Sequence, residues 1–263
     1  MRNYALALVG ALAARASAEC TLDVLMTATN DLFTAQTAGN TQAASFADTI
    51  KYMENRKTTD ITKGILSQAL KIDHNRSQHD VTQCAAFSEF IVTNSAKPYV
   101  IATQMRLDNT TYKVSQIDTI LTTKGDWLFN VTGTMYWASR EKWDEIPADK
   151  RDSRAVIQAA ADAYCDIFND KNVKVPWGSP CARLEGGSYT GKGQASDRCD
   201  VGIPSGVKLI NRQYVIDEAY GTVDIQMDFG GAGGLPDSHE FRIEGGKIRY
   251  VHTLSSCGGK SCM

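Results

Sequence analysis

The sequence predicts an α+β protein built from two tandem units, residues 19–145 and 154–263, each with one helix covering a curved antiparallel sheet. Three observations predict this fold class. A helical stretch opens each half of the chain, long strand pairs follow each helix, and the halves share one spacing between a cysteine and a Tyr-Val-Ile triplet. The charged stretch 142–154, which contains Pro147, is the expected linker. Each unit would enclose a pocket between its helix and the concave face of its sheet.

Apolar residues at near-helical spacing predict one helix from about Thr21 to Thr37 and a second from Arg154 to Asn169. An extended stretch that contains a glutamate follows each helix, with Glu54 in the first half and Glu185 in the second. These two glutamates therefore occupy matching places in the predicted units.

The halves also match in the spacing of a short motif. Cys84 and Cys199 each precede a Tyr-Val-Ile triplet by 15 residues, and the triplets begin at Tyr99 and Tyr214. Each triplet begins a predicted antiparallel strand pair, joining residues 100–105 with 113–122 and residues 214–219 with 221–229. The match favours an internal duplication over coincidence, with Tyr99 and Tyr214 at equivalent positions.

Residues 1–18 have the pattern of a secretory signal peptide. Arg2 is followed by an apolar run at residues 4–14 and by the small residues Ala16-Ser17-Ala18. No later segment approaches the roughly 20 consecutive apolar residues of a membrane span, so we expect a secreted protein or one in the lumen of the secretory pathway. Three N-glycosylation triplets agree with a eukaryotic secretory route, and their acceptors are Asn75, Asn109 and Asn130.

The chain contains seven cysteines, and an oxidising compartment favours pairing most of them. Sequence does not fix the connectivity. The pairings that we favour all close loops within one half of the chain: Cys20 with Cys84, Cys181 with Cys199, and Cys257 with Cys262. The last of these spacings suits a C-terminal disulfide clip better than a zinc knuckle. The odd cysteine is left free or pairs between chains in a homodimer.

Charge and motifs exclude several classes of function. The formal net charge is −2 at pH 7, and removal of Arg2 and Arg15 with the signal peptide makes it more negative. Such a chain offers little to a phosphate backbone, so we expect no nucleic-acid partner. The sequence contains no Gly-Xaa-Ser-Xaa-Gly elbow and no nucleotide-binding loop, which disfavours the common hydrolase and dinucleotide-binding classes of enzyme.

One predicted hairpin near the C-terminus carries two histidines. Gly245-Gly246 fits a two-residue turn, because both central positions need a positive φ. Counting outward from this turn gives three opposed pairs on one apolar face: Ile243 with Ile248, Phe241 with Tyr250, and His239 with His252.

We therefore expect His239 and His252 to line a ligand cavity, with Tyr250, Phe241 and Ile248 as its wall. Imidazole titrates nearest to physiological pH and could supply a proton. The alternative is that both histidines are structural residues bonded to the backbone. A zinc site is disfavoured because no third ligand has a suggestive spacing, so we expect no metal.

Two glutamates and one tryptophan are further candidates for the pocket. Glu54 and Glu185 each have an arginine two residues away on the same strand face, Arg56 and Arg183. Such a carboxylate could act as an acid or a base, although a structural ion pair is commoner. Trp127 could line an apolar pocket, and core packing would explain it equally well.

Four segments of the second half carry a resemblance to a known family. They are Ala-Arg-Leu-Glu-Gly-Gly at residues 182–187, Val-Gly-Ile-Pro-Ser-Gly at 201–206, Asn-Arg-Gln-Tyr-Val-Ile-Asp at 211–217 and Ser-His-Glu-Phe-Arg at 238–242. This half resembles a domain of uncharacterised role that is common in secreted fungal proteins and looks related to the NTF2/SnoaL group. The whole chain is similar in length and layout to the fungal hetero-Diels-Alderases of tropolone sesquiterpenoid biosynthesis.

The resemblance implies a reaction without a cofactor. A hydroxymethyl tropolone would lose water to give a quinone methide, and a humulene-type sesquiterpene would capture this in a cycloaddition. An apolar pocket would orient the two reactants, and an acid would help water to leave. The partner implied is a small apolar or polyketide-terpenoid substrate. The alternative function is a non-catalytic secreted binder or effector that holds an apolar ligand.

Overall fold

The computed structural model describes residues 20–258 and 260–262. The expected signal peptide, residues 1–18, lies outside the described residues. The first predicted helix is confirmed as α1 (Leu22–Ala38), which begins where the Thr21 hydroxyl accepts a hydrogen bond from the backbone N–H of Val24. Its buried side chains, among them Leu25 and Leu32, recur at helical spacing and face the first sheet.

The first sheet contains the six strands of the N-terminal half, in the order β2-β1-β6-β5-β4-β3. Four of them form an antiparallel meander: β3 (His74–Asp80), β4 (Ala85–Val92), β5 (Tyr99–Leu107) and β6 (Val114–Thr122). β1 (Phe46–Glu54) runs parallel to β6, and β2 (Lys57–Thr58) is a short antiparallel edge. Between β2 and β3 lies a 3₁₀ turn, η1 (Ile65–Ser67), and the core between α1 and the sheet buries its first two residues.

The second sheet repeats this order as β8-β7-β12-β11-β10-β9. Its long strands are β7 (Trp177–Glu185), β9 (Leu209–Asp217), β10 (Thr222–Phe229), β11 (Leu235–Glu244) and β12 (Lys247–Ser255), and β8 (Ser188–Tyr189) is the short edge. β7 runs parallel to β12. The second predicted helix is confirmed as α3 (Arg154–Ile167), which packs Ile157 and Tyr164 against this sheet.

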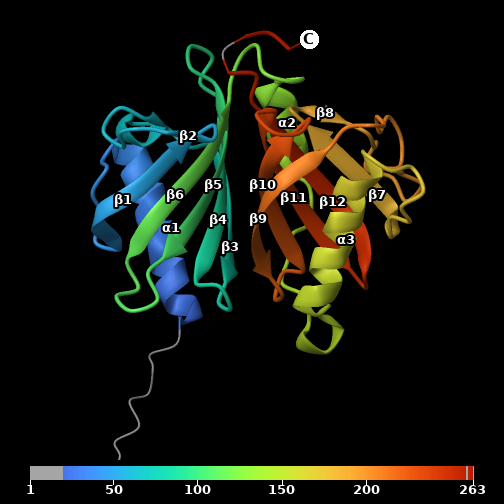
Figure 1. The fold of residues 1–263 in the computed structure, drawn as a ribbon, viewed down its shortest axis with the longest axis horizontal. Helices are drawn as coiled ribbons and strands as arrows, with labels where there is room; N and C mark the ends of the chain where they lie inside the picture. Colours follow the sequence, from blue (N-terminus) through green and yellow to red (C-terminus); the bar gives the residue numbers. More distant parts are fainter. Residues whose placement is uncertain (1–19, 259, 263) are drawn as a thin grey trace, which may run out of the picture.

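The two sheets lie face to face, with α1 and α3 on their outer sides (Figure 1). An apolar cluster joins the inner faces through Phe87 and Ile120 from the first sheet and Val215 and Leu254 from the second. The helix α2 (Val131–Ala138) and the turn η2 (Ala148–Lys150) lie in the segment between the two sheets. Among the described residues, no helix combines the length and the apolar character that crossing a membrane requires.

The prediction of two helix-on-curved-antiparallel-sheet units of the NTF2/SnoaL type is wrong. Both sheets are mixed, because the first long strand of each half runs parallel to the last. The described residues form three α-helices, and the expected linker is partly buried, since Trp143 packs against the second sheet. Alternation along a strand predicts which side chains share a face, but it carries no information about which strand becomes the neighbour.

The internal repeat is present in the strand order, but the motif that suggested it is not equivalent in the two halves. Tyr99 begins β5, whose counterpart is β11, whereas Tyr214 lies within β9. The equal cysteine-to-tyrosine spacing is therefore coincidental. Glu54 and Glu185 do match, because they end the corresponding strands β1 and β7.

The predicted turn at Gly245-Gly246 is confirmed, with φ of 56° and 69°. Ile243 faces Ile248 as predicted, but β12 then bulges at Arg249 and the remaining register shifts by one residue. His239 therefore pairs with Thr253, not with His252. Because a one-residue slip moves every later side chain to the opposite face, His239 and His252 point away from each other.

The three favoured cysteine pairs lie at disulfide distance. The Cα atoms are 5.5 Å apart in Cys20–Cys84, 5.2 Å in Cys181–Cys199 and 5.8 Å in Cys257–Cys262. The odd cysteine, Cys165, is completely buried in the core under α3, so it is not placed to pair with another chain.

We predict that Cys165 reacts with iodoacetamide only after the chain unfolds. Burial keeps reagent out and raises the pKa of its thiol, which suppresses the reactive thiolate. Intact mass should show no label on the native oxidised protein and one label in denaturant without reductant. Denaturant with reductant is the control and should add seven labels, one for each cysteine of the chain. Labelling of native protein would contradict the buried position.

Candidate functional site

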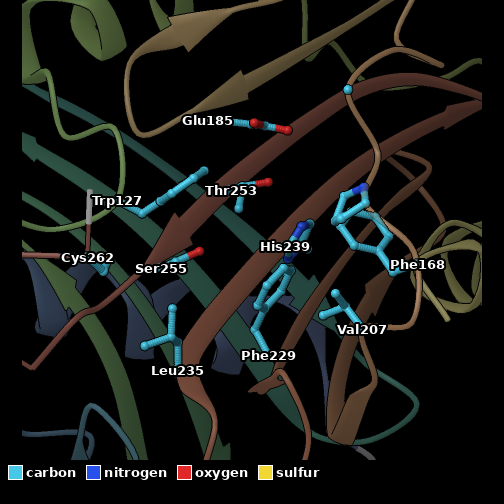
Figure 2. Close-up of a pocket in the computed structure, with 12 residues that line it drawn as sticks. Trp127, Phe168, Glu185, Val207, Phe229, Leu235, His239, Thr253, Ser255 and Cys262 are labelled. Carbon is cyan, nitrogen blue, oxygen red and sulfur yellow. The ribbon is translucent and has the colours of Figure 1, made fainter.

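A cavity of about 290 Å³ opens on the α3 side of the second sheet (Figure 2). Most of its wall is apolar and comes from five separate segments, with Trp127, Phe168, Val207, Phe229 and Leu235 as its main contributors. The polar lining is concentrated on the sheet, where Glu185, His239, Thr253 and Ser255 face the cavity. The cavity therefore has a mostly apolar wall and one polar side, which the sheet forms.

Strand register places three of these polar groups in one row across the sheet. Glu185 of β7 lies beside Thr253 of β12, and Thr253 lies opposite His239 of β11. Neighbouring strands are about 4.8 Å apart, so the backbone positions that carry a carboxylate, a hydroxyl and an imidazole follow one another at that interval. Glu185 is far from the other two residues in the sequence, and only the pairing of β7 with β12 brings it beside them.

His239 is held by a carboxylate beneath the cavity. Its Nδ1 hydrogen-bonds Oδ1 of Asp237, which is completely buried, and the hydroxyl of Ser255 donates to Oδ2 of the same carboxylate. The imidazole packs against both Tyr164 and Phe241, with ring centroids at 5.6 and 6.0 Å. Since Nδ1 is engaged, Nε2 is the ring nitrogen that a ligand can reach.

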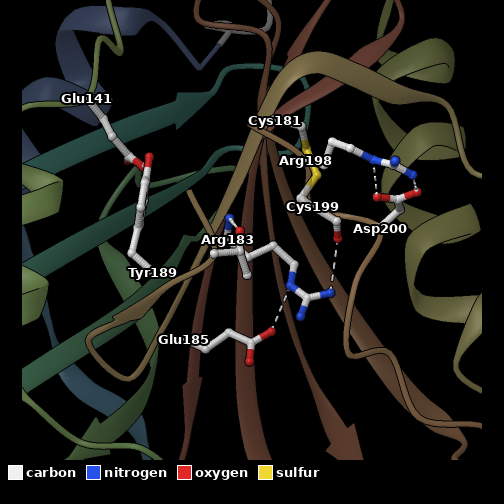
Figure 3. Close-up of a disulfide and its surroundings, with 9 residues drawn as sticks. Glu141, Cys181, Arg183, Glu185, Tyr189, Arg198, Cys199 and Asp200 are labelled. Carbon is white, nitrogen blue, oxygen red and sulfur yellow. Dashed lines mark hydrogen bonds and ion pairs between the residues drawn. A yellow bond between two sulfur atoms is a disulfide. The ribbon is translucent and has the colours of Figure 1, made fainter. Parts of the chain in front are cut away.

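Glu185 is oriented by an arginine from its own strand. Nε of Arg183 lies 2.9 Å from Oε1 of Glu185, and Nη1 donates to the backbone oxygen of Cys199 at 3.1 Å (Figure 3). The disulfide between Cys181 and Cys199 ties that oxygen to the strand that carries Arg183. The disulfide therefore supports the arginine, and the arginine fixes the carboxylate at the cavity.

His252 does not belong to this cavity. It lies on the inner face of the sheet, where its Nδ1 is 3.0 Å from Glu89 and its Nε2 is 2.6 Å from Glu141. Burial alone would lower the pKa of His252, but the two carboxylates outweigh burial and raise it to about 10. Tyr250 lies on the same inner face and stacks on Trp143, so the prediction that both residues serve the cavity is wrong.

The inner face contains a buried group with metal-ligand chemistry that the sequence did not reveal. Ligand atoms of Glu89, Glu240 and His252 all lie within 4.8 Å of one another. Glu89 comes from the other sheet, so sequence spacing could not identify it. The guanidinium of Arg76 already pairs with Glu240 and lies 3.4 Å from Glu89, so we assign these residues to an ion-pair network between the sheets.

The remaining predicted pocket residues divide into two groups. Trp127 lines the cavity with 40% of its surface exposed, and Arg183 lies behind Glu185. Phe241 and Ile248 are buried in the core under α3 and do not line the cavity. Glu54 accepts hydrogen bonds from Tyr52 and from the backbone of η1, so it is structural. The three expected glycosylation acceptors, Asn75, Asn109 and Asn130, are all exposed.

Asp237 is the residue of the site that sequence reasoning missed. It lies two positions before His239, so the two share a strand face and can form a hydrogen bond. This spacing is the signal that could have found it.

Residues 150–255 match the model of a family described as a domain of unknown function, DUF8021. The match covers the cavity-bearing half of the chain, and no curated protein matches the sequence.

We predict that the inter-sheet network makes stability depend on pH in the alkaline range. His252 has a raised pKa in the folded state, about 10 against 6.5 for a free side chain. The stabilisation that His252 gives to the folded state is therefore complete below about pH 6.5 and is lost as the pH rises through about 10. His252→Gln should cost about 3 kcal/mol at neutral pH, because it removes one partner of a buried ion pair.

Chemical denaturation of both proteins between about pH 6 and 10.5 tests this prediction. The difference in free energy of unfolding between wild type and His252→Gln should become smaller towards pH 10.5. His79→Gln is the matched control, because burial lowers the pKa of His79 to about 4 and keeps it neutral across this range. A His252→Gln effect that stays constant with pH would contradict the assignment.

Proposed function

We propose that this protein is a cofactor-independent enzyme that acts on a small, largely apolar molecule in the cavity of the second sheet. The observation that carries the proposal is the buried Asp237–His239 pair on the polar side of an otherwise apolar cavity. A carboxylate bound to Nδ1 fixes the orientation of an imidazole, and Nε2 can then give or take a proton from a ligand. Glu185, on the same row, supplies a second proton acceptor.

The reaction that we propose is the formation and capture of a quinone methide. The imidazolium of His239 would protonate the hydroxyl of a hydroxymethyl tropolone while Glu185 accepts the proton of the ring hydroxyl. The C–O bond breaks, water leaves, and the ring electrons form the exocyclic double bond. The proton that Glu185 has gained then returns through solvent to His239, so the site is restored.

The second step is a cycloaddition that needs no proton transfer. Two π bonds, one from the quinone methide and one from a humulene-type alkene, are converted into the two new σ bonds of the ring, and one π bond shifts. The cavity would contribute by holding the reactants in one orientation. A volume of about 290 Å³ is at the small end for ligand sites, so one reactant would be enclosed and the other would extend into the opening.

Secretion is part of the proposal. Three disulfides are typical of proteins from oxidising compartments, and they support passage through the secretory pathway. A non-catalytic carrier is the second candidate, because most of the cavity wall is apolar. Both candidates use the same cavity, and they differ only in whether His239 changes the ligand.

We predict that His239→Gln and Asp237→Asn lower the rate of adduct formation by roughly 10²-fold or more, the scale of losing a general acid or base. The assay combines purified protein with a hydroxymethyl tropolone and humulene and measures a stereochemically single adduct. Thermal unfolding of each variant separates loss of chemistry from loss of folding.

His252→Gln is the control for this experiment. It should lower stability but leave the activity of the folded fraction near that of wild type, because His252 faces the other sheet. Full activity in His239→Gln would refute the catalytic role. Saturable binding of the tropolone without turnover by the wild type would favour the carrier.

A further inference from the structure

The first half of the chain contains a counterpart of the polar row. Glu54 of β1 lies beside Thr119 of β6, and Thr119 lies opposite Thr103 of β5. By strand order these residues correspond to Glu185, Thr253 and His239 of the second half. The glutamate and the central threonine are thus the same in both halves, whereas the third residue differs.

In the first half this row is covered by the protein itself. Oε2 of Glu54 accepts hydrogen bonds from the backbone N–H of Ile65 at 2.7 Å and from the hydroxyl of Tyr52 at 2.9 Å. The hydroxyls of Thr103 and Thr119 bond each other at 3.1 Å. Ile65 and its neighbour Leu66 are 98% buried in the core above the row, since each exposes 2% of its surface.

A glycine allows this close approach. A Cβ atom at Gly64 would lie 2.7 Å from Oε2 of Glu54 and 2.4 Å from a ring carbon of Tyr52. The segment of η1 therefore reaches the row only because residue 64 has no side chain. It places an N–H donor on the glutamate and apolar side chains in the space beside it.

In the second half the corresponding segment, between β8 and β9, borders the cavity, and the row lines that cavity. The segment contributes Gly202, Pro204 and Val207 to the cavity wall. The hydroxyl of Thr253 is buried and has no hydrogen-bond partner among the described residues. Oε1 of Glu185 is paired with Arg183, and within the described chain no hydrogen bond reaches Oε2. This row lacks the partner that η1 supplies in the first half.

We infer that the ligand of the cavity carries a hydroxyl group that binds between Glu185 and Thr253, with its apolar body in the place that Ile65 and Leu66 take in the first half. A hydroxyl fits both groups, because it can donate to the carboxylate and accept from the threonine. An amide N–H could donate to the carboxylate, but its nitrogen could not accept from the threonine. The inference rests on the proposed function and specifies its substrate class as an apolar alcohol or phenol.

The test compares an alcohol with the ether that lacks its donor, 2-naphthalenemethanol and 2-(methoxymethyl)naphthalene. Titration calorimetry or ligand-observed NMR on the full chain gives both affinities. We expect the alcohol to bind about tenfold more tightly than the ether, since a hydrogen bond to a charged group is one of the stronger ones. Glu185→Gln should reduce this ratio to about threefold or less, and Thr253→Val should weaken the alcohol selectively.

Two control variants make the outcome decisive. Glu54→Gln alters the matched carboxylate of the first half, so it should lower the melting temperature and leave the ratio unchanged. Val207→Trp fills the cavity and should abolish binding of both compounds. If Val207→Trp abolishes binding while wild type and Glu185→Gln show the same ratio of alcohol to ether affinity, the inference fails and the proposed cavity stands. If Val207→Trp leaves both affinities unchanged, the ligand does not bind in this cavity. No saturable binding of the alcohol to wild type would also overturn the inference.

Discussion

One extra residue in β12 determines which side chains reach the cavity and which reach the other sheet. The bulge at Arg249 separates the pair Ile243–Ile248 from the rest of the β11–β12 ladder. Beyond it, Thr253 and Ser255 face α3 together with His239, whereas His252 faces inward. Without the bulge, His252 would face the cavity side, and the carboxylates of the inner face would keep Arg76 but lose the imidazolium. Both polar systems of the second sheet therefore depend on this irregularity.

The inner faces of the sheets are held in register by buried charges as well as by apolar contact. Arg76, Glu89, Glu240 and His252 form one group between these faces. Arg154, the first residue of α3, adds a separate link to the first sheet, because it pairs with the completely buried side chain of Asp80 at 2.7 Å. Buried charges cost free energy unless each one is paired, so a sliding movement of one sheet against the other would be strongly opposed. We infer that this network fixes the arrangement of the two sheets. It lies on the inner side and therefore does not occupy the cavity on the outer side of the second sheet.

The two halves use one architecture for different purposes. In the first, η1 fills the space above the polar row and completes a core. In the second, the equivalent space is open, and Thr103 is replaced by a histidine backed by Asp237. Opening a filled core creates a binding volume but also leaves polar groups without partners, which is tolerable where a ligand or solvent can supply them. The closed half thereby provides stability, and the open half provides the candidate site.

Local sequence determined both long helices and the Gly245-Gly246 turn, because periodicity and turn chemistry act over short distances. It also indicated the three favoured cysteine pairs without fixing their connectivity. It also placed Glu185, Trp127 and His239 among the candidates that the structure brings to one cavity. Only the tertiary structure decided that β7 pairs parallel to β12, that a bulge separates His239 from His252, and that Glu89 approaches from the other sheet. These features depend on which strands become neighbours and in which register. That choice is set by packing over the whole chain, so no pattern within a single strand contains it.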